Sequence, residues 1–216
     1  MVSSCYYSGN VRDCDRLESI LRSPRAEHPG AEYMRVECQH LYRGERSPDL
    51  QSFAPSADKA SIGMGVYLAQ EPIAAKEYAD MYCDMGHRHG TVYEAEIRNM
   101  AMLDVRVFGR SAACFIAYLS GLGFIQELEK YVSELESSAM VLVSLIKNYR
   151  FDYDGIPISA LLPEFFTSFL YTRGYDGLIN NRPRNADPGV PAFTEWLVYD
   201  PSKIKILRGI SPTEIT

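Results

Sequence analysis

The stretch Gly63-Met64-Gly65-Val66-Tyr67-Leu68-Ala69, followed by Pro72 and Tyr78, places the signals of a strand, a turn and a helix in close order. Two glycines open the short apolar run 66–69, which is typical of a buried strand. Pro72 suits the first turn of a helix, and the helical pattern runs to about residue 82. The sequence therefore predicts Tyr67 on a strand and Tyr78, eleven residues later, on the following helix.

The residues before this stretch predict one helix and one strand. Leu17, Ile20 and Leu21 recur at helical spacing within 13–23, and prolines and a glycine then end the pattern. Residues 33–42 are rich in strand formers and lead into Arg43 and Gly44. A long loop rich in proline and serine separates this strand from the stretch 63–69.

The residues after it alternate between strand and helix patterns without a regular βαβ order. Residues 92–97 alternate as a half-buried strand does, with Tyr93, Ala95 and Ile97 on one side. The segment 111–149 reads as helical, residues 158–171 as a further helix, and 176–179 as a strand followed by the loop 181–193. Residues 195–199 and 203–207 flank the turn 200–202 and are expected to form a final strand pair. The predicted class is α+β with mostly antiparallel pairing, in one domain over 1–216.

Composition narrows the function classes. The chain has 216 residues, 46% of them hydrophobic, which is enough for one substantial core. A net charge of -6 and a pI near 5.3 argue against a protein that coats nucleic acid. Five widely spaced cysteines without a CxxC pair favour a reducing compartment. We expect a cytoplasmic protein, because no signal peptide and no long apolar run appears, and no association with a membrane.

Several common catalytic motifs are absent. The sequence contains no GxGxxG, no Walker loop, no HExxH and no GxSxG. Ser144 and Lys147 match SxxK only within the helical segment and have no companion KTG. Cys83, His87 and His89 lack a fourth ligand at a usual spacing, so no metal is expected.

Five short motifs occur in a particular order along the chain. They are Leu41-Tyr42-Arg43-Gly44, the stretch 63–69, Tyr78, Tyr175-Asp176-Gly177-Leu178-Ile179, and the segment 195–205 that begins Glu195-Trp196. In this order they resemble the ADP-ribosyltransferase superfamily, and most closely its bacterial and phage-associated domains with the tyrosine pair of diphtheria toxin and poly(ADP-ribose) polymerases. The resemblance covers about 37–207. It implies two mostly antiparallel sheets packed as a split β-sandwich with flanking helices, the segment 111–149 being an insertion or flank.

The resemblance also implies roles for individual residues, with NAD as co-substrate. Cleavage of the nicotinamide glycosidic bond needs a flat aromatic slot and a carboxylate beside the ribose. Tyr67 and Tyr78 would form the slot, and Glu195 would stabilise the oxocarbenium-like transition state. The remaining NAD-binding residues would be Arg43, Gly44 and Gly65. Ordinary alternatives are core tyrosines, a solvated arginine at a strand end and a strand-edge glutamate.

The acceptor of ADP-ribose is the least determined part of this prediction. Relatives that modify arginine carry Glu or Gln two residues before the catalytic glutamate, where this chain has Phe193. Arg182 and Arg184 in the loop 181–193 suggest a nucleic-acid or acidic protein acceptor, or simply a solvated loop. The expected function is mono-ADP-ribosylation of a macromolecule by a toxin or phage-conflict effector, with an antitoxin or immunity protein as partner. The alternatives are an NAD glycohydrolase with the same pocket and a catalytically silent binding module.

Overall fold

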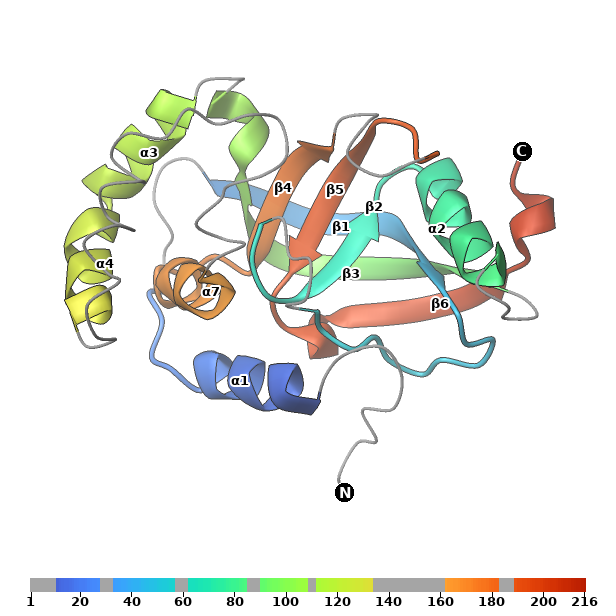
Figure 1. The fold of residues 1–216 in the computed structure, drawn as a ribbon, viewed down its shortest axis with the longest axis horizontal. Coiled ribbons are helices and arrows are strands. Elements are labelled where there is room, and N and C mark those ends of the chain that lie inside the picture. Colours follow the sequence, from blue (N-terminus) through green and yellow to red (C-terminus); the bar gives the residue numbers. More distant parts are fainter. Residues whose placement is uncertain are drawn as a thin grey trace.

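In the computed structural model, the described residues are 11–27, 33–56, 62–84, 90–108, 112–133, 162–182 and 189–216. They form an α+β fold in which helices surround a mixed sheet (Figure 1). The α+β class with mostly antiparallel pairing is therefore confirmed. The strands are β1 (Tyr33–Glu45), β2 (Val66–Ala69), β3 (Thr91–Asp104), β4 (Gly177–Arg182), β5 (Phe193–Val198) and β6 (Ile204–Ile210).

The six strands form one continuous sheet that turns back on itself. Their order is β1-β2-β5-β4-β3-β6, and β1 also pairs with β3. The pairing of β3 with β4 is parallel and the other pairings are antiparallel. The two sheets that the resemblance implies are thus joined here by hydrogen bonds into a single sheet.

One edge of strand β3 pairs with two different strands. Residues 92–97 pair with β6, whereas residues 102–104 pair with β4, and β1 runs along the opposite edge of β3. Asn99 lies between the two halves with a φ of 52°. Ile97 and Met100 both lie in the same core cluster, so the alternation of the strand shifts phase at this point. The left-handed residue therefore marks the position where the sheet splits.

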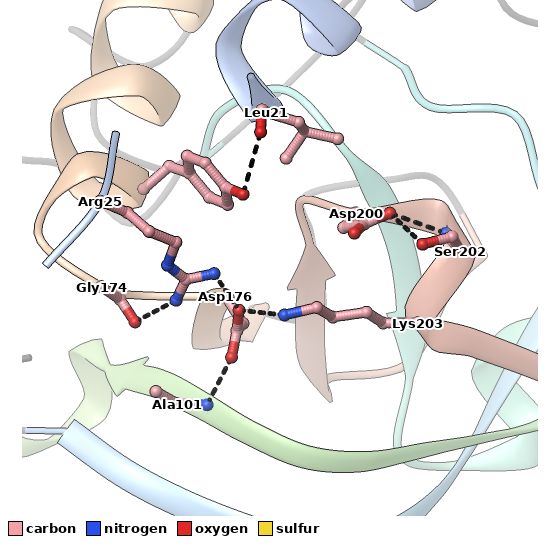
Figure 2. Close-up of polar contacts among 9 residues, drawn as sticks. Leu21, Arg25, Ala101, Gly174, Asp176, Asp200, Ser202 and Lys203 are labelled. Atoms are coloured by element: carbon pink, nitrogen blue, oxygen red, sulfur yellow. Dashed lines mark hydrogen bonds and ion pairs between the residues drawn. The ribbon is translucent and has the colours of Figure 1, made fainter. Parts of the chain in front are cut away.

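Asp176 lies beside Ala101 of β3, next to the stretch of that strand that pairs with neither β4 nor β6; Figure 2 shows its polar contacts. Its backbone N–H donates to the Ala101 carbonyl, and its own carbonyl accepts from the Tyr199 N–H. Its carboxylate accepts from the Ala101 N–H at 2.8 Å, from Arg25 Nη1 at 2.7 Å and from Lys203 Nζ at 2.6 Å. The side chain thus satisfies the edge of β3 where neither strand pairs with it.

Two main cores lie on the two sides of the strands β2, β5 and β4. We call the cluster enclosed by the sheet the inner core; it contains Val36, Leu41, Phe53, Val66, Leu68, Tyr93, Ala95, Ile97, Met100, Met102, Ile179, Trp196, Val198 and Ile204. The outer face of β2, β5 and β4 packs against helices (Figure 1). These are α1 (Val11–Leu21), α3 (Ala112–Gly121), α4 (Phe124–Ser133) and α7 (Pro163–Thr172), while α2 (Pro72–Asp84) packs mainly on β1.

Two expectations from the sequence need correction. The segment 111–149 is not one continuous helix in its described part: α3 ends at Gly121 and α4 begins at Phe124, with Gly123 at a φ of 87° between them. Its residues 134–149, including Ser144 and Lys147, lie outside the described residues. Strands β5 and β6 do not pair with each other, since β5 lies between β2 and β4 and β6 lies on β3.

The connection between β5 and β6 explains the second difference. Asp200 caps a short 3-10 helix, Pro201–Lys203, by accepting a hydrogen bond from the Ser202 N–H at 2.9 Å. This turn carries the chain from one half of the split sheet to the other, so it does not close a hairpin. In the part of the chain that the structure describes, no helix is both long and apolar enough to cross a membrane.

Candidate active site

Glu195 is a buried carboxylate in the middle of the sheet. It occupies the third position of β5, opposite Ala69 of β2 on one side and Asn180 of β4 on the other. Only 4% of the residue is exposed. Its neighbour Trp196 belongs to the inner core, so Glu195 points to the outer face of β5.

Strand register determines which side chains share that face. Residues directly opposite each other point to the same side of a sheet. Tyr67 lies opposite Leu197, and Arg182 lies opposite Phe193, while Leu197 and Phe193 are both two residues from Glu195. We call this surface of β2, β5 and β4 the Glu195 face; it carries Tyr67, Ala69, Asn180, Arg182, Phe193, Glu195 and Leu197.

Arg182 is an ionic partner of Glu195. Its Nη1 lies 3.7 Å from Glu195 Oε1, and both side chains are mostly buried. The sequence placed Arg182 and Phe193 in an acceptor loop, which is wrong as to position, because they are the last residue of β4 and the first of β5. Arg184 lies outside the described residues. Strands β4 and β5 extend this far because Arg182 and Phe193 pair with each other. The prolines and asparagines of this segment are typical of a loop, so its composition does not indicate the strand ends.

Tyr78 borders the Glu195 face from helix α2. Its ring meets the ring of Phe193 edge-on, with centroids 6.1 Å apart. Both pack with Ala69, Ala74 and the buried Val190. Ala69 is two residues from Tyr67 and points to the same face of β2. Tyr67 therefore lies on the Glu195 face, and Tyr78 lies beside it. Phe193, the residue that departs from the arginine-modifying pattern, is the direct ring neighbour of Tyr78.

The hydroxyl of Tyr67 is engaged by the loop before β2. It donates to the Gly63 carbonyl at 2.5 Å and accepts from the Ile62 N–H at 3.3 Å. Gly65 has a φ of 151°, and a Cβ there would lie 2.5 Å from the Val198 carbonyl oxygen. Gly65 thus has a structural role, since only glycine fits this start of β2, and its part in NAD binding stays a prediction.

Gly44 lies against helix α2. A Cβ at this position would overlap the Ala75 carbonyl oxygen and would lie 2.6 Å from the Ala79 nitrogen. The close approach of β1 and α2 therefore requires glycine. This packing positions the helix that carries Tyr78, and contact of Gly44 with nicotinamide stays a prediction.

Arg43 begins on the opposite side of the sheet from Glu195. Arg43 is two residues from Leu41, which belongs to the inner core, so the two side chains point to the same face of β1. The Arg43 guanidinium lies 5.4 Å from the ring centroid of Phe53 in the same cluster. Its Nε donates to Glu45 at 2.5 Å and its Nη1 donates to the Tyr67 carbonyl at 3.1 Å. Arg43 thus joins β1 to β2, and the structure does not bring its side chain to the Glu195 face.

The turn between β2 and α2 holds the start of β5. Glu71 Oε2 accepts from the Thr194 N–H at 2.9 Å, and the Gln70 N–H donates to the Thr194 carbonyl at 2.9 Å. These bonds tie the N-terminus of α2 to the residue between Phe193 and Glu195. The turn at residues 70 and 71 therefore fixes the start of helix α2, which carries Tyr78, relative to strand β5, which carries Glu195.

Two features of the site escaped the sequence analysis. Asn180, directly opposite Glu195, had no signal beyond being a polar residue in a strand. Tyr199, two residues after Leu197, points to the same face as Glu195 and is fully buried. Burial, together with the nearby Tyr67, raises the pKa of its hydroxyl well above the ordinary value. Tyr199 is therefore neutral at physiological pH. Of the metal candidates, His87 and His89 lie outside the described residues, and the side chain of Cys83 is not described.

Comparisons with known proteins give little further information. No protein-family model and no curated protein sequence matches the chain. Among solved structures, the crystal structure of the M. tuberculosis MbcT–MbcA toxin–antitoxin complex is similar over 95% of this chain and 97% of that chain. The TM-score is 0.37 and the sequence identity is 8%, so the match assigns neither a family nor an activity.

Proposed function

We propose that the protein is a mono-ADP-ribosyltransferase that transfers ADP-ribose from NAD to a macromolecular acceptor. The observation that carries the proposal is the placement of Glu195, a buried carboxylate whose face of the sheet also bears Tyr67 and is bordered by Tyr78. Charge buried at this depth is costly, so a strand retains it only with strong compensation or for a function. The order of motifs that resembles ADP-ribosyltransferases provides the chemistry that such a carboxylate would perform.

In the proposed reaction, the bond between the nicotinamide nitrogen and the ribose carbon breaks, and its electron pair neutralises the pyridinium ring. Positive charge then develops on the ribose, where Glu195 stabilises it electrostatically. A nucleophile of the acceptor forms the new bond to the ribose carbon and releases a proton. Tyr67 and Tyr78 hold the cationic ring before cleavage, and their cation-π attraction weakens once nicotinamide is neutral.

Arg182 has a defined place in this proposal. Its ion pair with Glu195 favours the ionised carboxylate, which is the form that stabilises a cation. Phe193 occupies the position at which an acidic or amide group would orient a guanidinium acceptor. We therefore propose an acceptor other than arginine, either a nucleic acid or an acidic protein surface, and an antitoxin or immunity protein as the partner that restrains the activity.

The test measures nicotinamide released from NAD by the purified protein, with and without cell lysate, alongside Glu195→Gln as the control. Release that depends on lysate, together with label transfer from a tagged NAD to a macromolecule, supports the proposal. Equal release without any acceptor would identify an NAD glycohydrolase instead. If neither reaction exceeds that of Glu195→Gln, the chain is a silent binding module and the proposal fails.

A further inference from the structure

A second group of chemistry-bearing side chains lies on β1 and β3, away from the Glu195 face. Cys38 Sγ, a ring nitrogen of His40 and a carboxylate oxygen of Glu96 all lie within 4.8 Å of one another. His40 is directly opposite Glu96 in the strand register, and Cys38 is two residues before His40 on the same strand. Adjacent strands therefore bring together three ligand types that a transition metal binds.

We propose that Cys38, His40 and Glu96 form a zinc-binding site with an open fourth position. Glu96 Oε2 lies 3.3 Å from Cys38 Sγ and 3.7 Å from His40 Nε2. In a tetrahedron with zinc–ligand bonds of about 2.0–2.3 Å, neighbouring ligand atoms lie roughly 3.3–3.7 Å apart. Both of these separations fall in that range, so Glu96 is already placed to share an ion with each of the other two ligands.

The hydrogen bond on the far side of the histidine supports this assignment. His40 Nδ1 lies 3.0 Å from Glu94 Oε1, and Nε2 lies 3.7 Å from Glu96 Oε2. Glu94 is itself held by Arg208, whose Nε donates to it at 2.7 Å. A carboxylate that accepts from the second ring nitrogen is the usual support of a metal-bound histidine, because it fixes the ring and increases its basicity.

Arg98 competes with the metal for one ligand atom. Its Nη2 donates to Glu96 Oε2 at 2.8 Å, and its Nε donates to Glu96 Oε1 at 2.7 Å. The Arg98 side chain is 64% exposed, so it can release Oε2 and keep Oε1 at small cost. Binding also displaces the thiol proton of Cys38 to solvent, because the thiolate is the ligand. The fourth position is left for water or a partner's side chain.

The site differs from the metal candidates that sequence spacing offered. Cys38 and His40 are neighbours on one strand, but Glu96 is far away in the sequence and reaches them only through the pairing of β1 with β3. Cys38 and His40 are exposed, whereas Glu96 is 7% exposed. The cluster is thus open to an ion from solvent while its carboxylate is held by the sheet.

The experiment titrates the purified, metal-free protein with Co²⁺, a spectroscopic substitute for zinc, followed by competition with Zn²⁺. We expect one equivalent to produce a thiolate-to-cobalt charge-transfer band and the intense visible bands of a tetrahedral ion, with zinc displacing the cobalt. Cys38→Ser should abolish the charge-transfer band. The matched control is Cys114→Ser, which removes another exposed cysteine and should leave the titration unchanged.

Three further variants test the remaining contacts. His40→Gln should weaken binding at least tenfold, and Glu94→Gln by about tenfold, because the carboxylate that orients the His40 ring is lost. Arg98→Ala should tighten binding, because it removes both a competitor and a positive charge. Circular dichroism checks that each variant folds. A band that survives Cys38→Ser, or the absence of any thiolate band at a cobalt excess in the wild type and Arg98→Ala, overturns the proposal.

Discussion

Asp176 and Glu195 are both buried carboxylates on neighbouring segments of the same sheet, yet their surroundings differ. Asp176 accepts hydrogen bonds from a backbone N–H, an arginine and a lysine at 2.6–2.8 Å (Figure 2). Glu195 lies 3.7 Å from Arg182 and is two residues from Phe193, whose ring meets the ring of Tyr78. The first carboxylate is enclosed by donors from three segments of the chain, whereas the second shares its face with groups suited to a substrate.

This difference separates a structural carboxylate from a candidate catalytic one. Burial alone raises the pKa of Asp176, but its bonds to Lys203, the Ala101 N–H and Arg25 outweigh burial and hold the pKa below the ordinary value. Such a group contributes to stability, and its three donors occupy most of its acceptor sites. Burial and charge would rank the two residues alike, whereas Tyr67 and Arg182 on the same face distinguish Glu195 as the candidate for catalysis.

The largest expected effect is on turnover. Glu195→Gln should lower nicotinamide release by about 10²–10³-fold, because it removes the charge that stabilises the transition state. The free energy of unfolding should change less than in Asp176→Asn, since the contact with Arg182 at 3.7 Å is longer than a hydrogen bond. Kinetics and urea denaturation on the same preparation measure both quantities. Wild-type turnover in this variant would remove Glu195 from the mechanism.

The matched change at Asp176 should act on stability. In Asp176→Asn, either orientation of the amide points its NH₂ group at a donor, the Ala101 N–H or the two cations. We expect a loss of roughly 3 kcal/mol in the free energy of unfolding, as for a broken buried ion pair. Residual folded enzyme should keep its KM for NAD. A stable Asp176→Asn variant with impaired turnover would reverse the contrast between the two carboxylates.

The contrast also predicts a dependence of stability on pH. The pKa of Asp176 is lowered in the folded state, so its contribution is fully present above the unfolded-state pKa of about 4. The contribution is lost as the pH falls from there through the folded-state pKa. Denaturation midpoints between neutral pH and pH 3 should therefore fall more steeply for the wild type than for Asp176→Asn. Parallel curves would mean that Asp176 does not contribute this linkage.

The two tyrosines give the smallest and most specific comparison. Tyr67→Phe loses the hydrogen bonds to residues 62 and 63 and should cost about 1 kcal/mol of stability. Tyr78→Phe keeps the ring that meets Phe193 and should be milder. Calorimetric titration with NAD should show Ala at either position weakening binding by about 1–2 kcal/mol. Equal damage by Phe and Ala at both positions would contradict a role for the ring faces.

Much of the fold was predictable because local patterns dictate it. The alternation of Tyr93, Ala95 and Ile97 correctly predicted the inner face of β3, and the glycines and Pro72 correctly predicted the boundaries of β2 and α2. The continuation of β3 beyond residue 97 was missed. Asn99 shifts the phase of the strand, so a strict period of two no longer holds across it.

The candidate site was predicted only in part. Glu195 and the two tyrosines were found from the order of motifs, and the structure places them on or beside one face. Arg43 was assigned to the same site, but it points to the same side of β1 as Leu41 of the inner core, which is the side of the sheet away from Glu195. Asn180 and Arg182 reach Glu195 through strand pairing, which no spacing in the sequence reveals.

The sequence by itself determined the α+β class and the position of most elements, since hydrophobic periodicity and turn residues act over short distances. Tertiary structure alone decided that β5 and β6 do not pair with each other and that Asp176 bonds to β3 between its contacts with β4 and β6. It also decided that Cys38 and His40 lie next to Glu96. Each of these depends on which strands become neighbours. That choice is made by packing and backbone hydrogen bonding across the whole sheet, which adjacent residues in the chain do not encode.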